Sequence, residues 1–374
     1  MGNYTGEKYS VTFKHGERDG ERGDAALGLV AGVGTDKTLA LNDFDSIMPW
    51  AAMGQCNTVL GNTVLATGER LPGAFKGEEG FDPVNKDVFV YVPRFYYKRE
   101  QRGKHETVTV SMRHFPGADV PRKFKREDGT IRNYVFLAAY TAGIKGGRLA
   151  SRTGLAPFCS SLNGFVELVR ENHDLFIEST EDDEIKNVLL EVEFATRDPQ
   201  SIMAGAVNAE EVFDSGACDA VVSSSGSPGD NTSGRFPCIW RGCENPWGNT
   251  FRFRWNVLVS DRVPHVLGNI RDYKRGEITD AYKPLKYKQS QWDGWADVMG
   301  YDPAFPDVAL PVSVAESYEE SSFGCYFWQW DRGVYALLVG GDVSDGRNAG
   351  ARYCYVTHAP SNSVWCSCAA LSPA

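Results

Sequence analysis

The sequence predicts an α+β fold of short twisted antiparallel strands, two main helices and long ordered loops. Two segments carry apolar residues at helical spacing, several short segments alternate between apolar and polar residues, and long irregular stretches connect them. At 374 residues, of which 42% are hydrophobic and 24% charged, the chain can bury one large core or two smaller ones.

The first 36 residues differ from the rest of the chain. They are rich in Gly and in charged residues, and they contain one candidate strand, KYSVTFKH (8–15). We expect residues 1–36 to form an N-terminal attachment or packing segment and residues 37–374 to form the main domain.

Two neighbouring strands are predicted at the start of the main domain. DVFVYVPRFYYKRE (87–100) alternates and is rich in β-branched and aromatic residues, which predicts a strand. Pro93 predicts an edge or a bulge within it, because proline cannot donate a ladder hydrogen bond. HETVTVSMR (105–113) is expected to pair with it.

The two helices are predicted over SLNGFVELVREN (161–172) and DEIKNVLLEVEFATRDPQSIMAG (183–205). Pro199 is expected near the end of the second helix, since its ring does not fit a helix interior. The acidic run ESTEDDE (178–184) is expected to be a solvated face or the entry of that helix.

The segment after residue 240 predicts a turn and a strand. ENPWGN (244–249) places the bulky Trp247 among turn formers such as Asn249, so we interpret it as an architectural turn. FRFRWNVLV (251–259) alternates, which predicts a half-buried strand with an aromatic inner face and its arginines turned outward. GVYALLVGG (333–341) predicts a second apolar strand that leads into the C-terminal tail.

Charge and hydropathy exclude several function classes. The net charge of −10 argues against a nucleic-acid partner and against docking on anionic lipid, since both need a basic face. No apolar run approaches the roughly 20 residues that span a bilayer, so we expect no membrane insertion. The N-terminal residues show no apolar region of a signal peptide.

The sequence offers no self-sufficient enzyme site. Its six His residues have no metal-binding spacing, and neither G-x-S-x-G nor a phosphate-binding glycine loop occurs. Nine Cys residues without zinc spacing are expected to be mostly buried thiols. We therefore predict no catalytic residue, no metal site and no cofactor.

The last 34 residues have an unusual composition. They contain no Lys, Glu, Gln or Met, whereas the preceding 340 residues contain 15 Lys, 23 Glu, 6 Gln and 6 Met. At that rate about five such residues would be expected in the tail. This depletion needs a cause.

A family resemblance supplies one. NDFDSIMPWAAMGQCN, VFVYVPRFYYK, EFATRDPQSIMAGAV, RGCENPWGNTFRFRW, MGYDPAFP, LLVGGDVSDGRNAGARY and APSNSVWCSCAALS occur in an order that resembles the variable proteins of diversity-generating retroelements and related phage tail proteins. The resemblance covers roughly residues 40–374. It implies a C-type lectin fold, shared with formylglycine-generating enzymes, with a variable region at about residues 340–370.

In such systems a reverse transcriptase misincorporates bases at template adenines. AAC and AAT codons then change at their first two positions only, and they can never specify Lys, Glu, Gln, Met or Trp. By comparison with the family pattern, the ligand-binding variable positions would be Asp342, Ser344, Asp345, Arg347, Cys354, Tyr355, Thr357, His358, Val364, Cys366 and Cys368. The supporting scaffold would be Trp247, Asn249, Gly340, Gly341 and Trp365.

The resemblance therefore implies a ligand-binding, receptor-recognition protein that is not an enzyme. Its variable side chains should be exposed on one rim, because exposed loop positions tolerate substitution. Tyr353, Tyr355, His358 and Trp365 should supply rigid aromatic contact area. The expected partner is a host-cell surface protein or glycan, with other virion proteins, and the expected setting is a phage tail or a bacterial cell surface.

Two alternatives remain open. The first is a formylglycine-generating-type copper oxidase that uses Cys354 with a second thiol. The second is a phage tail structural protein of fixed specificity. The fold also leaves open a calcium site near residues 244–249, where few acidic residues lie.

Overall fold

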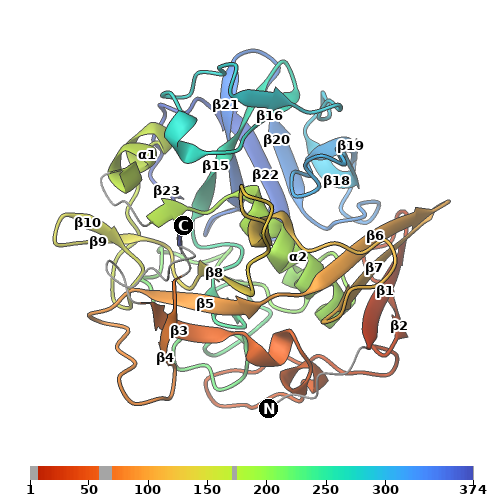
Figure 1. Cartoon of the computed structure of the whole chain (residues 1–374), viewed down its shortest axis with the longest axis vertical. Coiled ribbons are helices and arrows are strands. Elements are labelled where there is room, and N and C mark those ends of the chain that lie inside the picture. Colours follow the sequence, from red (N-terminus) through yellow and green to blue (C-terminus); the bar gives the residue numbers. More distant parts are fainter. Residues whose placement is uncertain (1–6, 59–69, 171–174, 374) are drawn as a thin grey trace.

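The computed structural model describes residues 7–58, 70–170 and 175–373 and has an α+β architecture in which strands predominate (Figure 1). The predicted α+β class is confirmed, and the described residues contain the two expected α-helices. These are α1 (Leu162–Arg170) and α2 (Thr180–Phe194). No helix in the described ranges is long and apolar enough to cross a membrane.

Three larger sheets build the molecule, and most of their strand pairs are antiparallel. The first has the order β2 (Glu21–Asp24), β1 (Lys8–Lys14), β7 (His105–Ser111), β6 (Tyr96–Arg102). The second has the order β4 (Pro72–Phe75), β3 (Gly54–Thr58), β5 (Val88–Pro93), β8 (Tyr134–Ala138).

The third and largest sheet carries most of the C-terminal part of the chain. Its order is β17 (Tyr282–Pro284), β16 (Val263–Leu267), β15 (Phe251–Ser260), β21 (Val334–Gly340), β22 (Gly350–His358), β20 (Tyr326–Gln329), β18 (Gly294–Met299), β19 (Pro311–Ala315). β23 (Ser367–Cys368) pairs with β15 in parallel.

Short pairings complete the fold. They are β9 (Gly143–Lys145) with β10 (Arg148–Ala150), β11 (Leu175–Ile177) with β24 (Leu371–Pro373), and β12 (Ser225–Gly226), β13 (Ile239–Trp240) and β14 (Cys243–Glu244). The β11–β24 pair fastens the C-terminal strand beside the entry of α2.

The described part of the N-terminal segment packs into the molecule. β1 pairs with β7 along its whole length, with Val11 opposite Val108. Val11 and Phe13 are fully buried in a core cluster that also includes residues of α2. Residues 7–36 thus contribute two strands, β1 and β2, and core side chains, whereas residues 1–6 lie outside the described residues.

The single strand predicted over residues 87–100 is wrong, because the segment forms two strands in two different sheets. β5 ends at Pro93, and β6 begins at Tyr96 and turns toward the first sheet. The chain changes sheets where the missing proline N–H weakens the ladder. The predicted partner is confirmed, since β6 pairs with β7, with Tyr97 opposite Val110.

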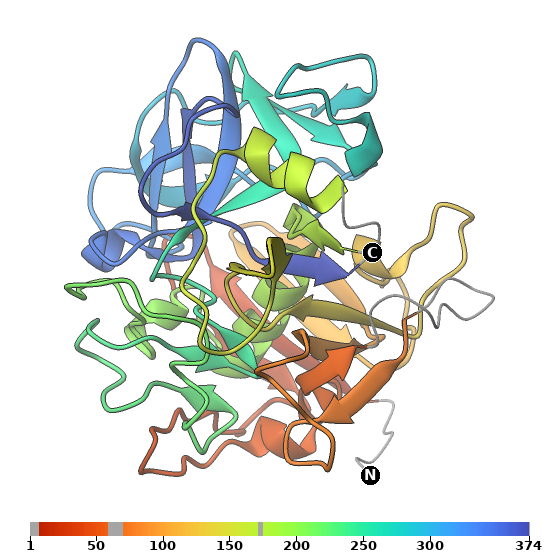
Figure 2. The ribbon, with the colours of Figure 1, turned by 90° about the vertical axis from the view of Figure 1, so that its left-hand side faces the viewer.

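Helix α2 lies between the large sheet and the N-terminal sheets (Figures 1 and 2). Ser179 caps it, and the Asp182 carboxylate accepts a hydrogen bond from the Ser179 amide, which forms a capping box. The helix-entry interpretation of the acidic run is therefore confirmed. The solvated-face interpretation is wrong, because Asp182 and Glu184 are buried. The predicted end of the helix is wrong, because α2 stops at Phe194, where Ala195 adopts a left-handed conformation, and Pro199 begins a separate short 3-10 turn.

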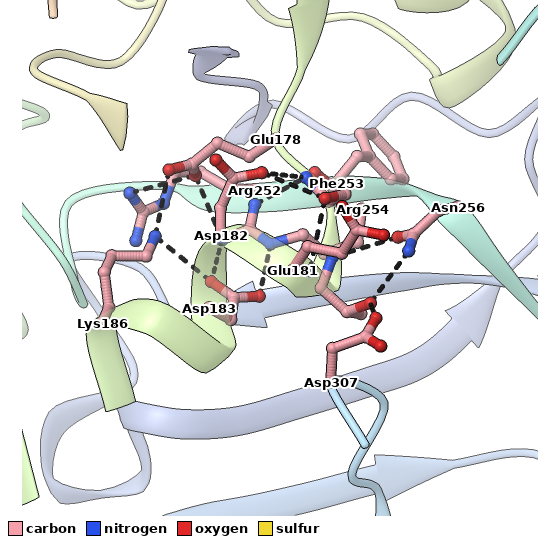
Figure 3. A network of polar contacts seen from close by, with 12 residues as sticks. Glu178, Glu181, Asp182, Asp183, Lys186, Arg252, Phe253, Arg254, Asn256 and Asp307 are labelled. Atoms are coloured by element: carbon pink, nitrogen blue, oxygen red, sulfur yellow. Dashed lines mark hydrogen bonds and ion pairs between the residues drawn. The ribbon is translucent and has the colours of Figure 1, made fainter. Parts of the chain in front are cut away.

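Strand β15 is buried on both faces, contrary to the prediction of outward arginines. Arg252, Arg254 and Asn256 are almost fully buried because the entry of α2 covers them. Arg254 donates to both carboxylate oxygens of Asp183, at 2.5 and 2.7 Å, and its Nη2 lies 3.1 Å from Glu178 (Figure 3). Buried charges require such partners, so carboxylates at the entry of α2 make the buried strand possible.

The predicted alternation of β15 also breaks in the middle. A bulge between Arg254 and Leu258 shifts the register against β21. As a result Trp255 and Leu258 pack in one core cluster, and Val257 packs in another. An inserted residue exchanges the two faces of a strand. The period-two pattern predicted that all the apolar residues of this strand point to one face. That prediction is wrong, because they point to one face before the bulge and to both faces after it.

Candidate ligand-binding surface

The tail begins with a sharp turn made by two glycines. Gly340 and Gly341 have φ values of +90° and +79°, which L-residues with side chains rarely adopt. A Cβ at Gly341 would lie 2.6 Å from the Cβ of Ala349. The turn links β21 to the loop 342–348, and its backbone conformation and close packing favour glycine at both positions.

The ENPWGN turn (244–249) packs against the glycine turn at 340–341. The Gly248 amide donates to the Gly340 carbonyl at 3.0 Å. Trp247 is fully buried, and its indole N–H donates to the Met203 carbonyl at 3.0 Å. The Asn249 side chain is bonded in both directions to the backbone of Phe213. Trp247 and Asn249 therefore hold the turn in place through burial and backbone hydrogen bonds.

Asp342 organises the loop from inside. Its Oδ1 accepts hydrogen bonds from the Ser344 amide and hydroxyl, both at 2.8 Å, and its Oδ2 accepts one from the Cys366 thiol at 2.9 Å. The Asp342 amide donates to Asp345 at 2.8 Å. Burial raises the Asp345 pKa to about 6. These contacts join the loop after β21 to the segment before β23.

Five of the eleven predicted variable side chains are buried, so the expectation that they face a ligand is wrong. Each is at most 5% exposed: Asp342, Cys354, Thr357, Cys366 and Cys368. Cys354 and Thr357 belong to β22, an inner strand between β20 and β21, and the segment of Cys366 and Cys368 pairs with β15 through β23. Tyr353, expected as contact area, is also fully buried.

The other six predicted positions reach the surface. Ser344 and Arg347 are exposed, and four others are partly exposed: Asp345, Tyr355, His358 and Val364. Trp365 was predicted as a scaffold residue, but its side chain is 67% exposed. It therefore does not anchor the tail by burial, and its exposure fits the predicted aromatic contact area instead.

A chain of ring contacts connects three of these exposed positions. The Arg347 guanidinium lies 4.5 Å from the ring centre of Tyr318. From there the ring centroids follow one another at 4.6–6.4 Å through Trp295, Tyr326, Trp328, Tyr355 and His358. All six rings in this series of contacts are partly exposed. We call these seven residues, from Arg347 to His358, the aromatic face.

Neighbouring strands of the large sheet place these rings together. Trp295 of β18 lies opposite Tyr326 of β20, and Trp328 of β20 lies opposite Tyr355 of β22. Behind them, the buried Tyr353 stacks on Phe251 of β15 at 5.9 Å. Five of the six rings lie on strands, and only Tyr318 lies in a loop, so little backbone freedom remains to be lost on binding.

Sequence reasoning missed the rings contributed by β18, β20 and the loop before β20. One signal was present, because Tyr326, Trp328 and Trp330 alternate and predict aromatic rings on one face of a strand. Trp330 is 59% exposed and packs on Tyr335 rather than in the chain of rings. The pairing of β20 with β22 has no local sequence signal.

The cysteines have different environments. Cys354 is buried and donates to the Arg352 carbonyl, and burial raises its pKa to about 12. Cys366 donates to Asp342, and burial together with this carboxylate raises its pKa. Cys368 lies beside Cys159. Within the described residues no group of His, Cys, Asp or Glu has metal-binding geometry.

Comparison with known proteins adds no family. No protein-family model matches the chain, and no curated protein matches it.

Proposed function

We propose that this protein is a ligand-binding, receptor-recognition protein whose C-terminal variable surface includes the aromatic face, on a C-type lectin-like domain. The observation that supports it best is the convergence of two independent features. The positions selected from the tail, Arg347, Tyr355 and His358, belong to the same chain of partly exposed rings as residues from β18 and β20.

The chemistry of the aromatic face suits recognition. Tyr and Trp offer large rigid contact area with a polar edge, and Arg adds a cation that stacks on rings. Such side chains carry most of the binding energy in many interfaces. The ligand is a host-cell surface protein or glycan, and the setting is a phage tail or a bacterial cell surface.

The absence of Lys, Glu, Gln and Met from the tail supports adenine-directed mutagenesis as the source of variation. The geometry narrows the positions that can vary freely. Substitutions at exposed positions usually change stability by no more than about 0.5 kcal/mol, whereas core changes cost several-fold more. Free variation is therefore expected at Ser344, Asp345, Arg347, Tyr355, His358 and Val364.

Sequencing the DNA around the gene in several isolates tests this proposal. We expect a reverse-transcriptase gene and a near-copy of the 3′ end that differs almost only at adenines. Replacements should concentrate at the six exposed positions. A tail that is invariant among isolates and lacks a template copy would refute diversification and favour the tail structural protein of fixed specificity.

The oxidase alternative depends on Cys354. That thiol is 5% exposed, and its raised pKa disfavours the thiolate that binds copper. An oxidation assay on a Cys-containing peptide with added copper distinguishes the two. Copper-dependent turnover that Cys354→Ser abolishes would favour the oxidase.

A further inference from the structure

Two cysteines from distant parts of the chain lie side by side. The Sγ atoms of Cys159, in the segment before α1, and Cys368, in β23, are 3.2 Å apart and 209 positions apart in sequence. A disulfide needs about 2.05 Å between the sulfurs. The two sulfurs are not joined in this structure, and they need to approach by only about 1 Å to form the bond.

Backbone hydrogen bonds hold the two segments against each other. The Ser160 amide donates to the Ser367 carbonyl at 3.1 Å, directly beside the thiols. On the other side of Cys368 the contact runs through Ala142, whose amide donates to the Ala369 carbonyl at 2.8 Å and whose carbonyl accepts from the Phe158 amide at 2.9 Å. The proximity of the thiols is therefore set by the fold, and only a local adjustment of the two side chains is needed to join them.

The two thiols differ in access. Cys159 is partly exposed, whereas Cys368 is completely buried. The hydrogen bond with Cys368 lowers the pKa of Cys159, and the same contact raises the pKa of Cys368. A reagent in solution therefore reacts with Cys159 first. The buried Cys368 sulfur lies close enough to attack the product formed on Cys159.

We propose that Cys159 and Cys368 are a redox-active pair that closes to an intramolecular disulfide in the presence of a low-molecular-weight disulfide such as oxidised glutathione. The Cys159 thiolate attacks one sulfur of the reagent, which releases one glutathione thiolate and leaves a mixed disulfide. The Cys368 sulfur, losing its proton, then attacks Cys159 and releases the second glutathione. The protein loses two electrons and two protons, and the reagent is reduced to two thiols.

The cross-link would act on the tail. The Cys159 thiol donates to the carbonyl of Trp365 at 2.8 Å, so the pair lies directly beneath the loop that carries Val364 and Trp365. Oxidation removes this S–H donor and joins β23 covalently to the segment before α1. The disulfide thus fixes the base of an exposed loop without using any side chain of the aromatic face.

The test uses the full-length reduced protein incubated with oxidised glutathione and then alkylated. We expect a mass decrease of two hydrogen atoms, two fewer alkylatable thiols under denaturing conditions, and one peptide pair that links Cys159 to Cys368. Dithiothreitol should reverse all three changes. Cys159→Ser should abolish them, and the neighbouring Ser160→Ala should not.

Two outcomes would overturn the proposal. One is a persistent glutathione adduct on Cys159, which would show that Cys368 does not resolve it. The other is a link from Cys159 to Cys366, the next thiol along the tail. The peptide map of the wild-type protein decides between these results even if a variant fails to fold.

Discussion

Asp342→Ala tests whether the tail is organised from inside, as the geometry indicates. The substitution removes an acceptor that is 4% exposed and that takes hydrogen bonds from the Ser344 amide, the Ser344 hydroxyl and the Cys366 thiol. Hydrogen bonds to charged groups contribute about 1.5–3 kcal/mol, and an unsatisfied buried donor costs about 1–3 kcal/mol. We therefore expect a loss of about 2–4 kcal/mol in the free energy of unfolding.

Two companion variants sharpen this test. Asp342→Asn keeps a carbonyl oxygen where Oδ1 lies, so it should cost less than about 1.5 kcal/mol, the worth of one ordinary hydrogen bond. Arg347→Ala changes an exposed side chain of the same loop and should stay within about 0.5 kcal/mol. Equilibrium urea unfolding followed by Trp fluorescence measures all three. If Asp342→Ala is as stable as Arg347→Ala, the carboxylate does not hold the loop.

Three further predictions concern the frame. Trp247→Ala should destabilise the protein by about 3–5 kcal/mol, whereas Trp365→Ala should stay within about 0.5 kcal/mol, because only the first indole is buried; equal urea midpoints would contradict this. Arg254→Met should cost about 3–5 kcal/mol, since it leaves Asp183 and Glu178 short of a buried cation; an unchanged thermal midpoint would show that Lys186 compensates. Burial raises the Glu244 pKa in the folded protein to about 8, from 4.5 in the unfolded chain. As pH rises above 4.5 the unfolded chain loses this proton while the folded protein keeps it, so the stabilising contribution of protonated Glu244 is lost between pH 4.5 and 8. Glu244→Gln should flatten unfolding curves measured across that window, and an unchanged slope would refute the assignment.

Local patterns predicted the elements whose burial follows from their own sequence. The second helix was found from its apolar spacing, and Ser179 with Asp182 marks its start in the structure. β15 was found as a strand, but the environment of its arginines was not. Arg254 looks solvent-facing from its neighbours, and it is buried only because a helix 60 or more positions earlier brings Asp183 to it. Long-range charge pairing of this kind leaves no periodic signal.

Only part of the candidate surface could be predicted from the sequence, again because long-range contacts leave no local signal. Codon chemistry and family pattern selected Arg347, Tyr355 and His358 without reference to any fold. The rings of Trp295 and Tyr326 join them through the pairing of β18, β20 and β22. Strand order is set by how the whole core closes, not by the residues of one strand. The residues of the tail therefore indicate one side of the surface and carry no signal for the other.

The largest side chains among the predicted variable positions all lie in the exposed group, which also contains the smaller Ser344, Asp345 and Val364. The five buried positions carry only Asp, Cys and Thr, which are small, whereas the exposed group includes Arg, Tyr and His. A close-packed interior penalises an oversized side chain by about 1–3 kcal/mol, and solvent does not. If adenine-directed changes reach both groups, variants with large side chains at positions 354, 357 and 366 would be destabilised whatever ligand they bind. The surface would then be diversified by codon chemistry, and the interior of the same segment would be filtered by packing.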